Sequence, residues 1–381
     1  MKGLSFMSEI KILHTGDLHI GASRTGIKGG RAEIINTFFR IINLCKTEKV
    51  DFLLVSGDLF DKPFVDADTA SEIIGAMSHI PDTVIAVSPG NHDCACAESI
   101  YRTAKFPPNV VIFSSFSESF DFPHKNVCLF GAAFTDSFQE QPLLTKAYPL
   151  DPDRINICVL HGDLVPSSTE SSYNPITANA VSECGFDYLA LGHIHKRTQI
   201  KKLGKTYFSY CGCPDGKGFD EDGSHGVYLG TISKERCELN YIPMSSRQYV
   251  LDKTDITGCT TSLDIATKIS AQIKEKYSPD YEKNLYRISL TGNIKADFLP
   301  NITQIESALT DKVEYIRISD ETDTDLTDIS LIASENSLRG IFVQKMLEMT
   351  EGADESRKEL HIRALQLGLK AFEKGVSLND N

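Results

Sequence analysis

Short apolar runs alternate with longer stretches of helical periodicity through the first half of the chain. Buried strands are predicted from five apolar runs, at residues 11–14, 52–55, 83–87, 155–160 and 186–190. Amphipathic helices are predicted where apolar side chains recur every three or four residues, at residues 31–49, 68–79 and 176–184. Strands that alternate with helices in this way favour an α/β fold.

The pattern changes after residue 197. Four short strands with Gly-rich turns are expected to complete a second sheet of the same domain, at residues 198–202, 206–210, 227–232 and 237–242. A smaller β/α piece is expected next, with helices at 265–277 and 302–309 and strands at 285–290 and 313–318. We therefore expect a first domain over residues 1–245, a smaller α/β domain over 246–330 and a helical tail over 331–381.

The tail follows an acidic stretch at residues 320–325 and contains two predicted amphipathic helices. Apolar side chains share one face of each helix: Leu338, Ile341, Phe342, Met346 and Met349 on the first, and Leu360, Ala364, Leu365, Leu369 and Phe372 on the second. These faces suit packing within the chain or docking of a partner, and the pattern leaves both open.

Composition narrows the class of protein. Among the 381 residues, 41% are hydrophobic and 24% are charged, which is typical of a globular protein, and no apolar stretch suggests a membrane span. The N-terminus does not resemble a secretory signal, and ten scattered cysteines suit reduced thiols, so we expect a cytoplasmic protein. The net charge of −13 means that binding to a phosphate backbone would need a local basic patch or a partner.

Metal-competent side chains stand at the ends of the five predicted strands. They are Asp17 and His19, Asp58, Asn91 and His92, His161, and His193 and His195. Any one of them alone is more often a capping or hydrogen-bonded polar residue, but ligands in α/β folds bind where strands end, and eight such residues there are hard to ascribe to chance. The set is too large for one zinc ion and suits two divalent ions about 3.5–4 Å apart that share a carboxylate. Nitrogen and oxygen donors suit manganese, iron or zinc.

The order of these motifs resembles the calcineurin-like metallophosphoesterases. Asp-x-His, Gly-Asp-x-x-Asp, Gly-Asn-His-Asp, His-Gly and Gly-His-x-His follow one another between residues 15 and 195. The flanks at residues 12–21 and 57–61, and more loosely residues 216–221 and 338–342, are similar to the DNA repair exonuclease branch that contains the nuclease subunit of SbcC–SbcD complexes. The resemblance implies a four-layer αββα sandwich with a smaller capping domain.

The resemblance also implies a role for each site residue. Asp17, His19 and His195 would hold one ion, Asn91, His161 and His193 the other, and Asp58 would bridge both. His92 would protonate the leaving oxygen, and Asp61 would accept a hydrogen bond from His92. Two divalent ions, manganese before iron or zinc, would be the cofactors.

The substrate is less well defined by the sequence. A DNA exonuclease or endonuclease is one hypothesis, supported by the branch-like flanks and by basic residues next to the motifs: Arg24, Lys196 and Arg197. The same basic residues suit an ordinary solvated surface, and the acidic net charge favours the alternative of a small phosphodiester or a phosphoprotein. A scaffold subunit without activity would not need the complete ligand set. The branch implies an SbcC-like coiled-coil ATPase as partner, bound through the tail, and a homodimer also stays open.

Overall fold

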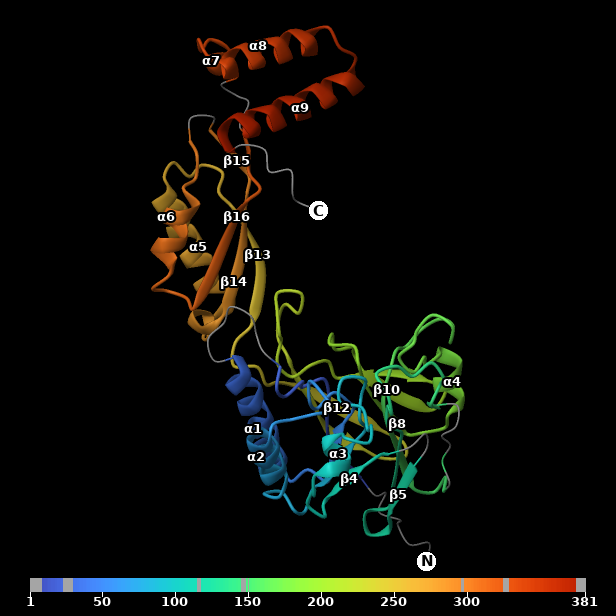
Figure 1. The fold of residues 1–381 in the computed structure, drawn as a ribbon. Coiled ribbons are helices and arrows are strands. Elements are labelled where there is room, and N and C mark those ends of the chain that lie inside the picture. The colour runs from blue at the N-terminus through green and yellow to red at the C-terminus, as the bar shows by residue number, and fades with distance from the viewer. Residues whose placement is uncertain are drawn as a thin grey trace, which may run out of the picture. The chain divides into compact units, whose positions relative to one another are not determined.

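The computed structural model describes residues 9–22, 30–114, 118–144, 149, 151–295, 298–324 and 329–374. The chain divides into two compact units, residues 1–246 and residues 247–381 (Figure 1). Among the described residues, no helix is both long enough and apolar enough to cross a bilayer.

The first unit is built on two six-stranded sheets. The first sheet has the order β12-β11-β1-β2-β3-β4, with the strands β1 (Ile10–Thr15), β2 (Phe52–Val55), β3 (Val84–Val87), β4 (Val110–Ile112), β11 (Gly226–Ile232) and β12 (Cys237–Pro243). The second has the order β5-β6-β7-β8-β10-β9, with β5 (Glu118–Phe122), β6 (Val127–Gly131), β7 (Ile155–His161), β8 (Tyr188–Gly192), β9 (Lys201–Leu203) and β10 (Thr206–Tyr210). Strands β1 to β4 run parallel in the first sheet, and β6, β7, β8 and β10 run parallel in the second.

Three apolar layers hold the two sheets and their helices together. Helices α1 (Gly30–Glu48) and α2 (Ala67–Met77) cover the outer face of the first sheet, and α4 (Ala178–Glu183) lies on the outer face of the second. Because successive side chains of a strand point to opposite faces, Leu53 joins the outer layer and Leu54 the layer between the sheets. The order of layers agrees with the expected sandwich. Helix α3 (Ile100–Thr103) is a single short turn.

Two of the four strands expected to complete the second sheet belong to the first sheet instead. Strand β11 pairs antiparallel with β1, and β12 pairs with β11, whereas β9 and β10 extend the second sheet. A strand was predicted at residues 198–202, but β9 covers only residues 201–203. The hairpin β11–β12 is amphipathic, and the edge strand of either sheet could form hydrogen bonds with its backbone. The tertiary fold therefore decides which strand it pairs with.

The second unit contains a three-stranded parallel sheet and two layers of helix. The strands are β13 (Tyr249–Asp255), β14 (Leu285–Thr291) and β16 (Tyr315–Asp320), and a separate pair is formed by β15 (Asn293–Ile294) and β17 (Asp323–Thr324). Helices α5 (Ser262–Tyr277) and α6 (Ile302–Leu309) pack on this sheet, and the tail forms α7 (Ile329–Ala333), α8 (Leu338–Glu351) and α9 (Glu355–Lys374). The tail therefore falls within the same compact unit as the β/α piece.

The tail helices pack on each other through part of their predicted apolar faces. Val343 of α8 is buried with Leu365 and Leu369 of α9, and Phe342 contacts Phe372. Leu338 and Ile341 remain 77% and 55% exposed. The single face predicted for the first tail helix is thus divided between a packed side and an open side.

Candidate metal centre

The structure brings together the side chains predicted at the strand ends. Asp17 and His19 follow β1, Asp58 follows β2, and Asn91 and His92 follow β3, all in the first sheet. His161 is the last residue of β7, and His193 and His195 follow β8 in the second sheet. The site is therefore built from both sheets, at the carboxyl ends of parallel strands.

The loops after β1 and β2 hold their site residues in an unusual backbone conformation. Asp17, His19 and Asp58 have φ angles of 52°, 51° and 49°, in the left-handed region that costs a side-chain-bearing residue about 1 kcal/mol or more. The loops stabilise each other, because the Asp17 and His19 amides donate to the carbonyls of Gly57 (3.0 Å) and Asp58 (2.9 Å). Backbone strain concentrated on these residues points to a functional requirement for their side-chain positions.

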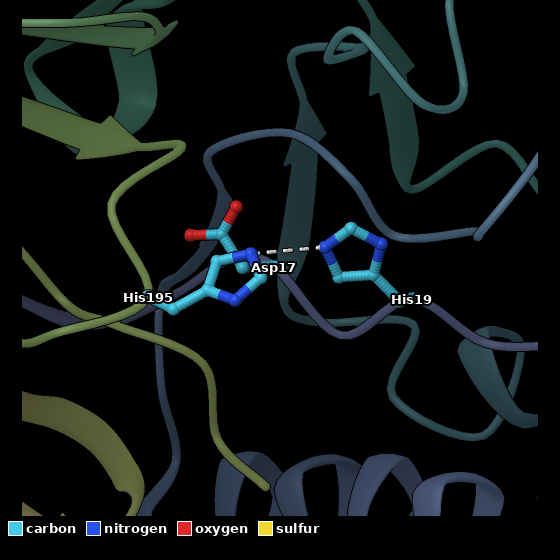
Figure 2. A group of neighbouring side chains, drawn as sticks. All are labelled: Asp17, His19 and His195. Carbon is cyan, nitrogen blue, oxygen red and sulfur yellow. Dashed lines mark hydrogen bonds between the residues drawn. The ribbon is translucent and has the colours of Figure 1, made fainter. Parts of the chain in front are cut away.

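Asp17, His19 and His195 form the first cluster of donor atoms (Figure 2). His19 and His195 face each other, with their Nε2 atoms 3.2 Å apart. The Asp17 carboxylate lies within 4.8 Å of the ring nitrogens of both. It also accepts the amide of His193 at 3.0 and 3.1 Å, which connects this cluster to the loop of the second.

Asn91, His161 and His193 form the second cluster. The Asn91 Oδ1 lies 2.9 Å from Nε2 of His161 and 3.2 Å from Nδ1 of His193, and these two nitrogens are 3.2 Å apart. Ligand atoms about 2.1 Å from one ion are expected to be about 3.0–3.4 Å from each other. The observed spacings match those of ligands to a single ion.

Asp58 lies between the two clusters. Its Oδ2 is 3.5 Å from Nε2 of His19 in the first cluster and 3.5 Å from Nε2 of His161 in the second. Its Oδ1 accepts the amide of His92 at 2.9 Å, and its side chain is only 2% exposed. This is the position that a carboxylate bridging two ions would occupy.

Each of the four histidines turns its other ring nitrogen toward an oxygen atom outside the clusters. The contacts are His19 Nδ1 to the Asp61 carboxylate (3.4 Å), His161 Nδ1 to the Ser56 carbonyl (3.0 Å), His193 Nε2 to the Asp163 carboxylate (3.3 Å), and His195 Nδ1 to the Glu221 carboxylate. A neutral imidazole has one N–H, so these oxygens leave the lone pairs directed into the clusters. A proton could satisfy one contact between facing lone pairs, whereas a cation satisfies all of them. The donor set therefore fits divalent metal ions.

Charges in the site act on one another across buried surroundings. Burial opposes ionisation of Asp58, but the neighbouring rings of His161 and His19 hold the pKa of its carboxyl below the usual range. Burial and the nearby His161 lower the pKa of His193, so its ring stays neutral and able to bind metal. Although burial opposes the effect, the hydrogen bond from His195 lowers the pKa of Glu221 to about 2, so its carboxylate is charged at neutral pH.

His92 differs from the other histidines of the site. It is exposed, and its Nδ1 lies 3.4 Å from the backbone carbonyl of Asp61. We expected the Asp61 carboxylate to accept from His92, and here the structure differs, because that carboxylate faces His19. The backbone oxygen of Asp61 takes the place of the expected side-chain acceptor.

Several residues that support the site were not predicted. Glu221 and Asp163 face His195 and His193. Asp93 is a buried residue of the loop after β3, and its carboxylate accepts the amides of Gly90 (2.7 Å) and Phe60 (3.1 Å). Burial and the charge of Asp58 raise the pKa of Asp93 to about 6. Asp93 is the last residue of the Gly-Asn-His-Asp motif and Asp163 directly follows His-Gly, so these positions could have been found from the sequence. Glu221 lies in a separate loop, and its contact with His195 depends on the fold.

The predicted substrate-binding residues have different surroundings. Lys196 and Arg197 line a cavity of about 300 Å³ next to His195, and the Arg197 guanidinium lies 3.9 Å from the centre of the Tyr241 ring. Arg24 lies outside the described residues. The cavity places two basic side chains beside a candidate metal ligand.

The chain is similar to one known family over part of its length and to individual proteins over most of it. Residues 10–197 match the family described as calcineurin-like phosphoesterase. The chain is 27% identical over 292 residues to the uncharacterized metallophosphoesterase YhaO of Bacillus subtilis, with 72% of this chain and 70% of that protein covered. It is 25% identical over 304 residues to the DNA double-strand break repair protein Mre11 of Sulfurisphaera tokodaii (75% and 74% covered), and 24% identical over 324 residues to that of Sulfolobus acidocaldarius (81% and 82% covered).

Proposed function

We propose, on the premise that residues 10–197 belong to the calcineurin-like phosphoesterases, that this metal-dependent phosphoesterase is a two-metal nuclease acting on DNA ends. The observation that carries the two-metal part is the pair of donor clusters with Asp58 at 3.5 Å from a ring nitrogen of each. The nuclease part rests on the relatives named for double-strand break repair.

Two divalent ions would be held by the residues already described, with manganese favoured over iron or zinc. Asp17, His19 and His195 would bind the first, and Asn91, His161 and His193 the second, with Asp58 shared. When bound, such ions neutralise phosphate oxygens and lower the pKa of water to about 7, so that hydroxide is available at neutral pH.

The residues of the chain orient the ligands and move the proton. Asp58 fixes the His92 backbone through the amide, and the exposed His92 ring lies 4.6 Å, centre to centre, from the ring of His19. His92 would protonate the leaving oxygen from Nε2 while Nδ1–H donates to the Asp61 carbonyl, and such acid catalysis contributes about 10²–10⁴-fold. Glu221 and Asp163 would each accept the N–H of a neutral ring, which directs the lone pair of the other nitrogen of His195 and of His193 toward the metal.

DNA binding would use the basic cavity beside the centre. Lys196 and Arg197 line it, and stacking of Arg197 on Tyr241 holds the guanidinium in place to contact a phosphate.

Because the net charge is −13, we also propose an SbcC-like coiled-coil ATPase that docks on exposed tail side chains such as Leu338 and Ile341. Gel filtration of the chain mixed with the ATPase encoded beside its gene tests this, and two separate peaks would contradict it. The same column run on the chain alone tests for a homodimer.

The alternative is a phosphodiesterase that acts on a small molecule or a phosphoprotein, which the acidic net charge favours. An assay with Mn²⁺ that compares linear duplex DNA, single-stranded DNA and bis-p-nitrophenyl phosphate separates the two. We expect cleavage of DNA as well as of the small ester. Cleavage of the small ester alone would favour the alternative.

A further inference from the structure

We propose that Phe138 and Tyr173 form a stacking platform for a nucleobase next to the scissile phosphate, a site that gives the proposed nuclease a preference for unpaired nucleotides. The platform is a series of three rings that starts at a metal-binding histidine. The ring centre of Tyr173 lies 4.9 Å from that of His193, with an angle of 31° between the planes. The ring of Phe138 follows at 5.5 Å and 35°.

The last ring of the series is open to solvent. Phe138 is 59% exposed, although a phenylalanine gains by burial, and its ring is tilted by 35° against that of Tyr173. An isolated exposed phenylalanine is ordinary, but this one continues a stack that begins in the candidate metal centre. Ring spacings of 4.9 and 5.5 Å are those of favourable aromatic pairs, so another flat π-system would extend the stack.

The backbone beneath the rings is fixed by hydrogen bonds. The Gln139 amide donates to the Ser172 carbonyl at 2.8 Å, and the Asn174 amide donates to the Gln139 carbonyl at 2.6 Å. The buried Asn174 side chain donates to the His161 carbonyl at 2.7 Å, which ties the platform to the metal centre. A surface fixed in this way loses little conformational entropy when a ligand stacks on it.

The adjoining cavity favours a base over a phosphate. It has a volume of about 490 Å³ and is lined by residues next to the platform, among them Glu140, Glu170 and Ser172. The carboxylates would repel a phosphate but can accept hydrogen bonds from the amino groups of bases, and the hydroxyl groups can both donate to and accept from base edges. Stacking tolerates every base and requires that the base be unpaired or turned out of a duplex.

The platform is tested with oligonucleotides that carry either a normal base or an abasic residue beside the cleaved phosphate. For the normal single strand, we expect Phe138→Ala to lower kcat/KM about 5- to 150-fold, mainly through KM, the range found when a base-stacking ring is removed. Phe138→Trp should retain the rate, and Phe138→Leu, which is apolar but cannot stack, should not. A 2-aminopurine base at that position should be quenched by the unaltered protein and by Phe138→Trp only. Leu263→Ala, at an exposed apolar residue of the other unit, is the control for loss of surface area and should change nothing.

The abasic strand separates stacking from a structural effect. The unaltered protein should cleave it as slowly as Phe138→Ala cleaves the normal strand, and Phe138→Ala should cause no further loss. An equal loss on both strands, or full activity of Phe138→Leu, would overturn the platform. This inference rests on the proposed nuclease function, and the two fail differently. If the protein hydrolyses bis-p-nitrophenyl phosphate but no DNA, both fall, whereas equal cleavage of normal and abasic DNA refutes the platform alone.

Discussion

The assignment of Asp58 as a shared metal ligand and of His92 as the acid can be tested by replacing each of them. Asp58→Asn removes the charge of a carboxylate whose Oδ2 lies 3.5 Å from the metal-binding nitrogens of both clusters. His92→Ala removes an exposed ring, and its backbone amide can still donate to Asp58. The two changes should therefore separate metal binding from turnover.

The expected magnitude follows from linkage between metal binding and folding. An ion that binds one site, and only in the folded state, stabilises that state by about 4 kcal/mol when its concentration is about 1,000 times Kd. For a unit the size of residues 1–246, this corresponds to an increase in Tm of about 8–16 °C. If Asp58→Asn weakens binding about 1,000-fold, the same concentration stabilises by only about 0.4 kcal/mol, and the shift falls to about 1–2 °C.

The assay is thermal unfolding with excess Mn²⁺ and with a chelator, together with turnover of bis-p-nitrophenyl phosphate. We expect His92→Ala to keep the whole metal-dependent shift and to lose about 10²–10⁴-fold in turnover. His79→Ala, at another exposed histidine, is the matched control and should keep both. A His92→Ala protein without the metal-dependent shift, or an Asp58→Asn protein with the full shift, would refute the division of roles.

Three further predictions test how the surroundings support the centre. Glu221→Gln removes the charge that orients a metal-binding ring and should weaken metal affinity about 10- to 100-fold, which the Mn²⁺ dependence of turnover would measure. In Gly192→Ala the new Cβ would lie 1.9 Å from the Ser56 carbonyl oxygen, so we expect a loss of about 1–3 kcal/mol or more in urea unfolding, whereas Gly75→Ala, with nothing within 4 Å, should be tolerated. Burial lowers the pKa of His14 to about 3, so between pH 6.5 and 3 the His14 ring binds a proton only in the unfolded state. The contribution of His14 to the free energy of unfolding is therefore fully present above pH 6.5 and falls as the pH drops. His14→Gln should remove about 2 kcal/mol of the stability lost between pH 7 and 5, and an unchanged pH dependence would contradict this.

Much of the first unit could be predicted from the sequence because its strands and helices carry strong local signals. Strand β2 and helix α6 have the predicted bounds, and α1 and β3 differ from them by one residue. Of the strands that were not predicted, β4, β5 and β13 are short or half exposed, so their apolar pattern is weak. Their existence depends on edges offered by neighbouring strands. Strand β6 was also missed, although it is a fully buried apolar run.

The metal-binding side chains could also be predicted from the sequence, because Asp, Asn and His recur at strand ends and parallel strands end at one edge of a sheet. Which side chains contact each other could not be predicted. Asp61 contacts His19 instead of His92, and Glu221 reaches His195 from a separate loop. Contacts of this kind depend on loop conformations, such as the left-handed backbone of His19, which no local pattern specifies.

The sequence by itself determined the alternation of strand and helix and the chemical nature of the donor atoms, since periodicity and residue type are local properties. Only the tertiary structure decided that the hairpin β11–β12 joins the first sheet, that Asp58 lies equally far from both histidine clusters, and that Phe138 continues a stack from His193. The physical reason is that these relations join segments far apart in the chain, and their distances are set by the packing of two sheets against each other.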